Sequence, residues 1–240
     1  MHILITGGGT EEPIDGVRSI CNFSTGRTSA YLCEYLSGLG YTVTSVQAER
    51  AVQAERALQA KPSMQTAGDM RVFTYRSFKD LETTLWRILS NERIDLVIHA
   101  AAVSDYCADT IEINGSSFPA GELDKIPSGE SVTVKLRENP KIIDSIKRWS
   151  INENCVLVGF KCTNGADFSS REEAVETLFT RASPDLVVSN DLSEINGDSH
   201  PTRIYKKNAL GKIECIGQGN TKKEMAEYIA AACCLQGEKS

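Results

Sequence analysis

Six short apolar runs recur along the chain, each bounded by polar or glycine-containing segments. They cover residues 2–5, 41–46, 71–75, 94–100, 155–160 and 185–190. Runs of this length between turn residues are typical of strands that are buried on both faces of a parallel sheet. The pattern therefore predicts six buried strands.

Segments with a helical period lie between these runs. Apolar residues recur at intervals of three and four in three sets: Leu32, Tyr35, Leu36 and Leu39; Val175, Leu178, Phe179 and Ala182; Met225, Tyr228, Ile229 and Ala232. Alternating strands and helices predict an α/β fold: a doubly wound, Rossmann-like parallel sheet with helices on both faces. Ligands of such sheets bind at the carboxyl ends of the strands, where the winding reverses. Residues 203–208 and 212–217 predict a small C-terminal hairpin before the last helix.

Two stretches interrupt this alternation. Residues 46–60 contain QAER twice, six residues apart, and are rich in helix-forming residues, which predicts a solvated helix or an extended loop. Residues 107–130 are long, polar and rich in Gly, Ser and Pro. Connections of this length are typical of active-site lids, so we expect a mobile flap there.

Composition limits the classes of protein that fit. A chain of 240 residues with 41% hydrophobic residues suits a single domain, 1–240. A net charge of −6 argues against nucleic-acid binding. The eight cysteines are scattered and lack zinc-ligand spacing, so we expect reduced thiols and no metal site held by protein ligands. No apolar run approaches the length of a membrane span, and no targeting segment is evident, so we expect a cytoplasmic protein without membrane contact.

The glycines after the first apolar run suggest a nucleotide-binding turn. Gly7 and Gly9 fit the first two positions of the dinucleotide fingerprint G-x-G-x-x-G, but the third position is Glu12, and Pro13 follows. A Walker phosphate loop fails as well, because no Gly-Lys-Ser/Thr follows. We therefore expect Gly7–Thr10, including Gly8 and Gly9, to provide close backbone approach to a ligand.

A second polar cluster precedes the first predicted helix. Ser24, Thr25 and Gly26 stand where free backbone N–H groups and the helix dipole favour an anion, although Ser24 or Thr25 could simply cap the helix. Upstream, Asn22 and Arg18 are polar groups at the mouth of the first strand. An amide there can bind a carboxylate or acyl group without carrying charge.

Other polar residues follow later strands. Small residues end the run at 94–100, which lets a flat ligand lie against the backbone, and Asp105 then offers an acceptor or a simple cap. Lys125 can approach a phosphate when the flap closes, or is a solvated loop lysine. Asn190 and Asp191 either face a ligand or cap their strand. Pro140 predicts a helix start.

The chain lacks the groups of a nucleophilic enzyme. There is no Ser-His-Asp order, no Cys-His pair and no isolated pair of carboxylates. This favours an enzyme that joins two substrates by positioning and charge stabilisation, with activation by a nucleotide.

These motifs occur in an order that resembles one family. The blocks GGGTEEPIDGVRSICNFSTG, AAAVSDY, KIPS, NPKI, VGFK and NDL resemble the phosphopantothenate–cysteine ligases of coenzyme A biosynthesis, over roughly residues 1–207. The length resembles the stand-alone bacterial form, which has no decarboxylase domain in front.

The resemblance implies a two-step reaction. The carboxylate of 4′-phosphopantothenate attacks the α-phosphate of a nucleotide, giving an acyl-nucleotide and pyrophosphate, and the amine of L-cysteine then displaces the nucleotide. It implies CTP as co-substrate, with ATP as the alternative, and Mg²⁺ with the triphosphate. It also implies a homodimer and a separate decarboxylase as a potential partner.

The resemblance also implies roles for residues. Asn22 matches the asparagine that holds the substrate carboxylate, with Arg18 nearby, and Lys125 matches the flap lysine. Further positions match nucleotide-binding residues of the family: His99, Ala100, Ala101, Asp105, Pro140, Lys141, Ile142, Ile143 and Phe160. The glycine loop, the helix start and the end of a later strand add Gly8, Gly9, Ser24, Gly26 and Asn190 as cofactor-binding candidates.

The sequence departs from the family pattern at several positions. A glycine usually found three residues after Gly26 is Ser29, Thr163-Asn164 replaces a frequent Glu-Thr, and two helix lysines fall on Leu178 and Ala182, with Arg181 as the nearby cation. Two alternative functions remain. A nicotinamide-dependent reductase is weakened because the Tyr75–Lys79 pair lies upstream of the small-residue strand end, and a non-catalytic nucleotide sensor would not need the flap lysine.

Overall fold

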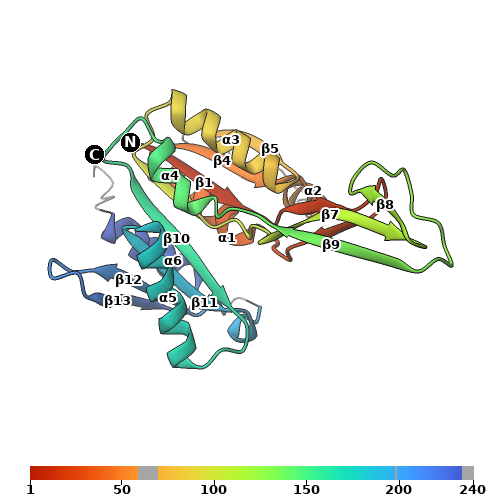
Figure 1. The fold of residues 1–240 in the computed structure, drawn as a ribbon. Coiled ribbons are helices and arrows are strands. Elements are labelled where there is room, and N and C mark those ends of the chain that lie inside the picture. Colours follow the sequence, from red (N-terminus) through yellow and green to blue (C-terminus); the bar gives the residue numbers. More distant parts are fainter. Residues whose placement is uncertain (59–69, 198, 234–240) are drawn as a thin grey trace.

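The computed structural model describes residues 1–58, 70–197 and 199–233, and side chains up to residue 54 in the first of these ranges. Eight strands form one large sheet in the order β13-β12-β11-β10-β6-β1-β4-β5 (Figure 1). The six strands predicted from the apolar runs are parallel to one another: β1 (His2–Gly7), β4 (Thr42–Ala48), β5 (Met70–Tyr75), β6 (Leu96–His99), β10 (Val156–Thr163) and β11 (Leu186–Asp191). β12 (Thr202–Lys207) and β13 (Ile213–Gly219) form the predicted C-terminal hairpin, antiparallel at the edge.

Helices cover both faces of this sheet. On one face lie α1 (Arg27–Gly38) and α6 (Lys222–Ala232), packed on Ile3, Ile5, Leu96 and their neighbours. On the other lie α3 (Phe78–Asn91), α4 (Ile143–Trp149) and α5 (Phe168–Ala182), packed on Leu4, Val97 and their neighbours. Successive residues of a strand point to opposite faces, so each buried strand serves two cores. The doubly wound, Rossmann-like prediction is confirmed, and the winding reverses between β1 and β6.

Of the segment 46–60 that contains the QAER repeat, residues 46–48 end β4, and the helix, the first of the two predicted alternatives, begins at Glu49. α2 (Glu49–Leu58) begins directly after β4, and its Ala51 is buried. The end of the repeat, residues 59 and 60, lies outside the described residues. α2 therefore starts at the carboxyl edge of the sheet, close to the glycine loop.

The segment 107–130, expected to be a mobile flap, contains regular strands in its first half. β7 (Tyr106–Ile113) and β8 (Ser116–Pro119) form a hairpin, and β9 (Val132–Glu138) pairs with the other edge of β7. The turn is Asn114-Gly115, both with positive φ (47° and 81°). Asn-Gly between strands is a strong hairpin motif. Only residues 120–131 connect β8 to β9 without regular structure.

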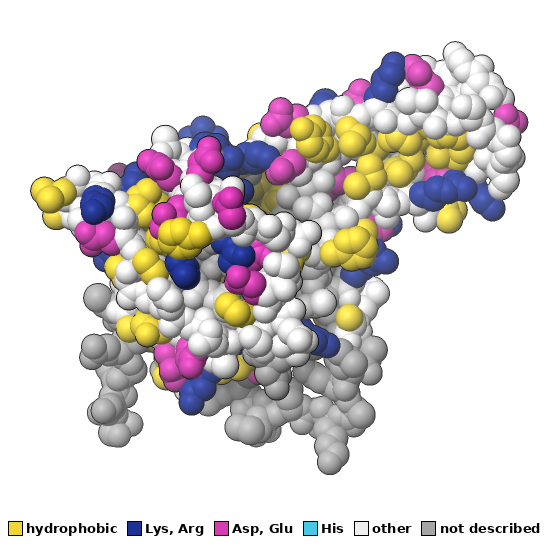
Figure 2. Space-filling model, turned by 90° about the horizontal axis from the view of Figure 1, so that it is seen from below, with side chains coloured by type: hydrophobic (Ala, Val, Ile, Leu, Met, Phe, Trp, Pro, Cys, Tyr) yellow, Lys and Arg dark blue, Asp and Glu magenta, His cyan; other side chains and the backbone are white. Residues whose placement is uncertain are grey.

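The three strands form an arm that projects beyond the carboxyl edge of the main sheet (Figure 1). Apolar side chains run along one face of this arm (Figure 2). Exposed large apolar residues of β7 and β9 are Tyr106, Val132 and Leu136. A shorter hairpin, β2 (Glu11–Pro13) and β3 (Ser19–Cys21), lies at the base of the arm and leads into α1. A 3₁₀ turn, η1 (Leu192–Glu194), follows β11.

Substituting two phenylalanines of α5 in turn measures how much burial in the core contributes to the free energy of unfolding. Phe179 is fully buried, whereas Phe168 is 52% exposed with the Arg203 guanidinium 4.7 Å from its ring centre. We expect Phe179→Ala to lower the free energy of unfolding by about 3–5 kcal/mol. Phe168→Ala, the matched control, should cost about 1 kcal/mol. Urea unfolding measures both, and equal losses would contradict the packing described here.

Candidate active site at the carboxyl edge of the sheet

The glycine loop is joined to the segment that follows β6. Ala102 N donates to Gly8 O at 2.8 Å, and Thr10 N donates to Ala102 O at 3.2 Å. Gly8 has φ of 83°, and a Cβ there would lie 2.5 Å from the Ala48 side chain. The loop therefore needs glycine for its close approach to protein segments, and its approach to a ligand stays a prediction.

Asn22 lies against this loop. A Cβ on Gly9 would lie 2.0 Å from Asn22 O, and Asn22 N donates to Thr10 O at 3.2 Å. The half-buried side-chain amide donates to Val103 O at 3.3 Å. One amide N–H is thereby used, and the second N–H remains available to an acceptor. The structure thus brings Asn22 together with the small-residue segment 100–105.

The start of α1 adjoins the same loop. Gly26 is the residue before the helix, with φ of 70°, and no side chain caps the helix. The alternative that Ser24 or Thr25 is the cap does not hold; both are exposed. A Cβ on Gly26 would lie 3.7 Å from Gly8 N. The uncapped N–H groups at the start of α1 thus lie beside the glycine loop, where they favour the binding of an anion.

Ser29, where the family pattern has glycine, is not a ligand-facing residue. Its side chain is 1% exposed, and Oγ lies 2.7 Å from Gly26 O and 2.9 Å from Gln47 Oε1. It fills the space above Gly7, where a Cβ would meet Ser29 Oγ at 1.7 Å. The serine therefore packs β1, β4 and α1 together instead of reaching the anion site.

His99 lies under the site rather than in it. The ring is 6% exposed, and Nδ1 lies 2.9 Å from Thr6 Oγ1, which also accepts from Ala101 N at 3.2 Å. Burial lowers the pKa of His99 to about 4, so the imidazole is neutral at physiological pH. The surfaces open to a ligand here belong to the half-buried Ala100 and Ala101.

Asp105 and Lys141 form an ion pair between the loop after β6 and the connection from β9 to α4. Beside them, the buried Asn139 donates two hydrogen bonds to the loop after β6: its N donates to Asp105 O at 2.8 Å, and Nδ2 donates to Ser104 O at 3.1 Å. Pro140 is exposed. Residues 104–105 and 139–141 are therefore neighbours.

The helix after Pro140 begins later than predicted, at Ile143. Ile142 and Ile143 are buried in the core cluster beneath α3, α4 and α5. Their side chains therefore support the site from below.

The carboxyl-terminal halves of β10 and β11 lie at the same edge. Phe160 is half-buried, and Asn190 Nδ2 donates to Cys162 Sγ at 3.5 Å. The carboxylate of Asp191 is fully buried and binds the segment after β10. It accepts from Thr163 Oγ1 at 2.7 Å and from Gly165 N at 2.8 Å. Hydrogen bonds from Ser193 and Thr163 hold the pKa of Asp191 far below its usual range. Of the two predicted alternatives for this residue, capping is the one observed.

Arg18 contacts the turn of the β2–β3 hairpin and the flap. Its guanidinium pairs with Asp15 at 2.5 Å and reaches Ile126 O at 3.4 Å. Lys125, the predicted flap lysine, is the exposed neighbour of Ile126. Arg18 thus belongs to the contact between the hairpin turn and the flap, and its role beside the substrate carboxylate stays a prediction.

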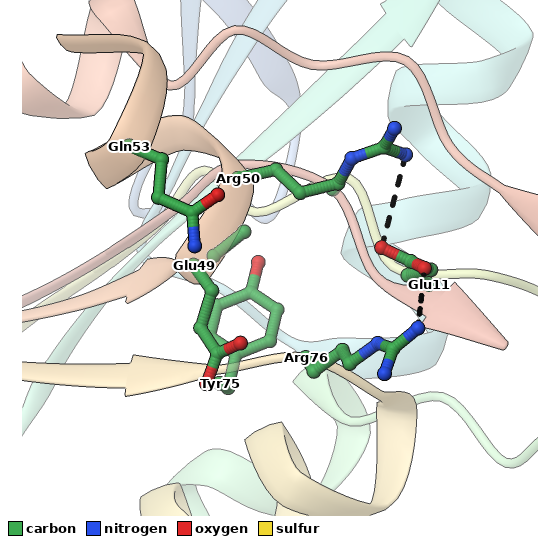
Figure 3. Close-up of a pocket in the computed structure, with 8 residues that line it drawn as sticks. Glu11, Glu49, Arg50, Gln53, Tyr75 and Arg76 are labelled. Carbon is green, nitrogen blue, oxygen red and sulfur yellow. Dashed lines mark hydrogen bonds and ion pairs between the residues drawn. The ribbon is translucent and has the colours of Figure 1, made fainter. Parts of the chain in front are cut away.

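A cavity of about 190 Å³ opens on the β4 and β5 side of the glycine loop. Glu11 accepts from Ser19 Oγ at 2.6 Å and Arg76 Nη2 at 2.8 Å, and Arg50 lies 3.7 Å away (Figure 3). These hydrogen bonds lower the pKa of Glu11. With Glu49, the lining carries two acids and two arginines, so its charges are balanced within the protein.

Sequence reasoning missed this cluster and the role of Asp15. Glu11 and Arg76 are 65 residues apart, and Asp15 and Ile126 are 111 apart, so no local pattern links them. Among the described residues, no three His, Cys, Asp or Glu side chains gather as a metal site. In the same part of the chain, no helix is long and apolar enough to cross a membrane.

Comparisons with known proteins agree on one family. Residues 1–234 match the DFP family, described as the DNA/pantothenate metabolism flavoprotein C-terminal domain. The chain is 28% identical over 228 residues to the coenzyme A biosynthesis bifunctional protein CoaBC of Thermococcus kodakarensis, covering 95% of this chain and 49% of that protein. It spans about half the length of the curated CoaBC relatives it matches.

Solved structures show the same relationship. The crystal structure of the DNA/pantothenate metabolism flavoprotein from Streptococcus pneumoniae superposes with a TM-score of 0.78 at 29% identity, covering 98% of this chain and 99% of that one. A Cab2 mutant in complex with phosphopantothenate-cysteine superposes with a TM-score of 0.63 at 19% identity, covering 96% and 86%. The latter likeness concerns the fold alone.

The buried His99 generates a pH prediction. Its pKa is lowered in the folded protein, so the unfolded chain binds a proton first as the pH falls below 6.5, and stability is lost toward pH 4. Between pH 7 and pH 5 this residue should remove about 2 kcal/mol from the free energy of unfolding. His99→Asn should flatten the pH dependence measured by urea unfolding by that amount. The same slope in both proteins would refute the assignment.

Proposed function

The chain belongs to the DFP family, and from this premise we propose that it is a phosphopantothenate–cysteine ligase of coenzyme A biosynthesis. The main support for this proposal is one junction in the structure. There, Asn22, the Gly8–Thr10 loop and residues 100–105 meet beside the uncapped start of α1. It offers an amide, backbone N–H groups and small residues, but no activated nucleophile. Such a site suits a reaction whose activation comes from a nucleotide.

In the proposed reaction, the carboxylate of 4′-phosphopantothenate attacks the α-phosphate of CTP, with ATP as the alternative. An acyl-CMP forms and pyrophosphate leaves. The amine of L-cysteine then attacks the acyl carbon, CMP leaves, and the amine loses a proton as the amide forms. We assign the first contact with the carboxylate to the second N–H of Asn22, because its first N–H is bound to Val103 O.

The nucleotide is proposed to lie on the β6 and β10 side of this junction. Ala100 and Ala101 leave room for a flat group, and Asp105 with Lys141 offers one acceptor and one cation. Mg²⁺ would arrive with the triphosphate, whose oxygens it prefers. Asp105 is the nearest carboxylate that this chain could add to its coordination. Lys125, exposed on the flap, is proposed to approach the phosphates.

We also propose a homodimer, supported by the exposed apolar side chains along the arm (Figure 2). A separate decarboxylase remains a proposed partner, because the curated relatives named CoaBC are bifunctional and this chain covers half of them.

The decisive experiment combines the assay with Asn22→Asp. Pyrophosphate release is measured with 4′-phosphopantothenate, L-cysteine, Mg²⁺ and either CTP or ATP; release with neither nucleotide would reject the ligase. Asn22→Asp should lower kcat/KM on the order of 10²–10³-fold, because it removes the N–H donor and places a charge beside the substrate carboxylate. Asn154→Asp, on the opposite edge of the sheet, is the matched control and should retain activity.

Lys125→Gln tests the flap. Among the described residues its ammonium has no ion-pair partner, so the substitution should leave the melting temperature unchanged. Pyrophosphate release should fall on the order of 10²-fold, because a fixed charge near the phosphates is lost. Lys212→Gln, in the exposed turn of the C-terminal hairpin, serves as control. A large fall in melting temperature would indicate a structural lysine instead.

A further inference from the structure

The turn of the β2–β3 hairpin binds residues 121–126 of the flap. Asp15, at this turn, has a fully buried carboxylate although it is charged. Its Oδ1 accepts from Val17 N at 2.8 Å and Arg18 N at 2.6 Å, and its Oδ2 accepts from Ile126 N at 2.8 Å. The Arg18 guanidinium completes the set at 2.5 Å. One carboxylate thus binds both its own turn and a segment 111 residues away.

Further contacts fix the same segment. Gly16 N donates to Leu123 O and Gly121 N donates to Ile14 O, both at 2.9 Å. A Cβ on Gly16 would lie 2.6 Å from Asp124 O, so the two backbones are in close contact. Ile126 is 5% exposed and anchors the end of the stretch. Residues 121–126 are therefore held along the turn at three points.

The hairpin also carries Asn22. β3 ends at Cys21, and the next residue is bound to the glycine loop through Thr10 and Val103. Lys125 immediately precedes the residue whose N–H Asp15 binds. A short hairpin of two three-residue strands therefore connects the two side chains to which the proposed function assigns the chemistry.

We propose that Asp15 is a positioning residue, which docks the flap on the β2–β3 hairpin and so sets Lys125 relative to Asn22; this rests on the proposed function for its effect on turnover. The bond from Ile126 N gives the largest contribution to holding the pKa of Asp15 well below its usual range, so the carboxylate stays charged at any working pH. Arg18 supports the docking from the outer side.

Trypsin measures the docking without any activity assay, because the Lys125–Ile126 bond is itself a tryptic site and its N–H is the one that Asp15 binds. Asp15→Asn keeps the shape but loses acceptor capacity and charge. Cleavage at this bond, identified by mass spectrometry of the folded protein, should become roughly tenfold faster. Glu122→Gln, an exposed acid on the same segment that is not adjacent to the cleaved lysine, is the matched control and should cleave at the wild-type rate.

Pyrophosphate release is the second readout. With the flap undocked, kcat should fall on the order of 10²-fold through misplacement of Lys125, while KM for 4′-phosphopantothenate changes little. If Asp15→Asn fails to fold, Gly16→Ala provides an independent route, because its methyl group would push Asp124 O away while Asp15 remains. It should show the same faster cleavage and lower kcat.

The outcomes separate the two proposals. Cleavage of Asp15→Asn or Gly16→Ala at the wild-type rate overturns the docking. Faster cleavage with unchanged kcat overturns the positioning role. A wild-type protein that releases no pyrophosphate overturns the proposed function, while the cleavage rates still decide whether Asp15 docks the flap.

Discussion

The backbone pairing between Gly8–Thr10 and Ala102–Ser104 holds the candidate site together. It extends the contact of β1 and β6 beyond the end of the sheet, at the point where the winding reverses. Ser104 N closes it by donating to Thr10 Oγ1 at 2.9 Å. Because Asn22 O lies where a Cβ of Gly9 would be, only glycine there lets a third segment join the pair. The segment between the glycine loop and α1 thus leaves the loop at Thr10 and returns to it at Asn22.

Buried carboxylates fix the loops around this junction. Asp15 binds the flap, Asp191 binds residues 163–166 and 193, and Glu12 accepts from Phe78 N at 2.8 Å at the start of α3. A carboxylate that accepts several backbone N–H groups stays charged at low cost, because each bond is charge-assisted. Glu12 has a single backbone donor, and desolvation raises its pKa. The loops are thus held mainly by directional bonds, which define their shape more sharply than apolar contacts do.

Local patterns predicted the parallel strands and the α1, α5 and α6 helices, because burial on both faces and helical period are readable from neighbouring residues. The Asn114-Gly115 turn was equally readable, yet its polar surroundings suggested an irregular flap. Contacts between distant segments were not readable. Arg18 was expected beside a substrate, but the acid three residues before it takes its charge. Site roles carried by the resemblance remain predictions, since geometry alone does not identify a ligand.

The departures from the family pattern now have a physical meaning. Leu178 and Ala182 lie on the buried stripe of α5, and the Leu178 side chain lies 3.3 Å from where a Cβ of Gly159 would be. A lysine would not fit there without disrupting the core. Arg181 is paired with Asp144 at 2.9 Å. The cation nearest Asp105 is therefore Lys141, contributed by the β9–α4 connection. Since Arg181 is held by Asp144, the ion pair of Asp105 and Lys141 is the one that the site proposed for the nucleotide contains.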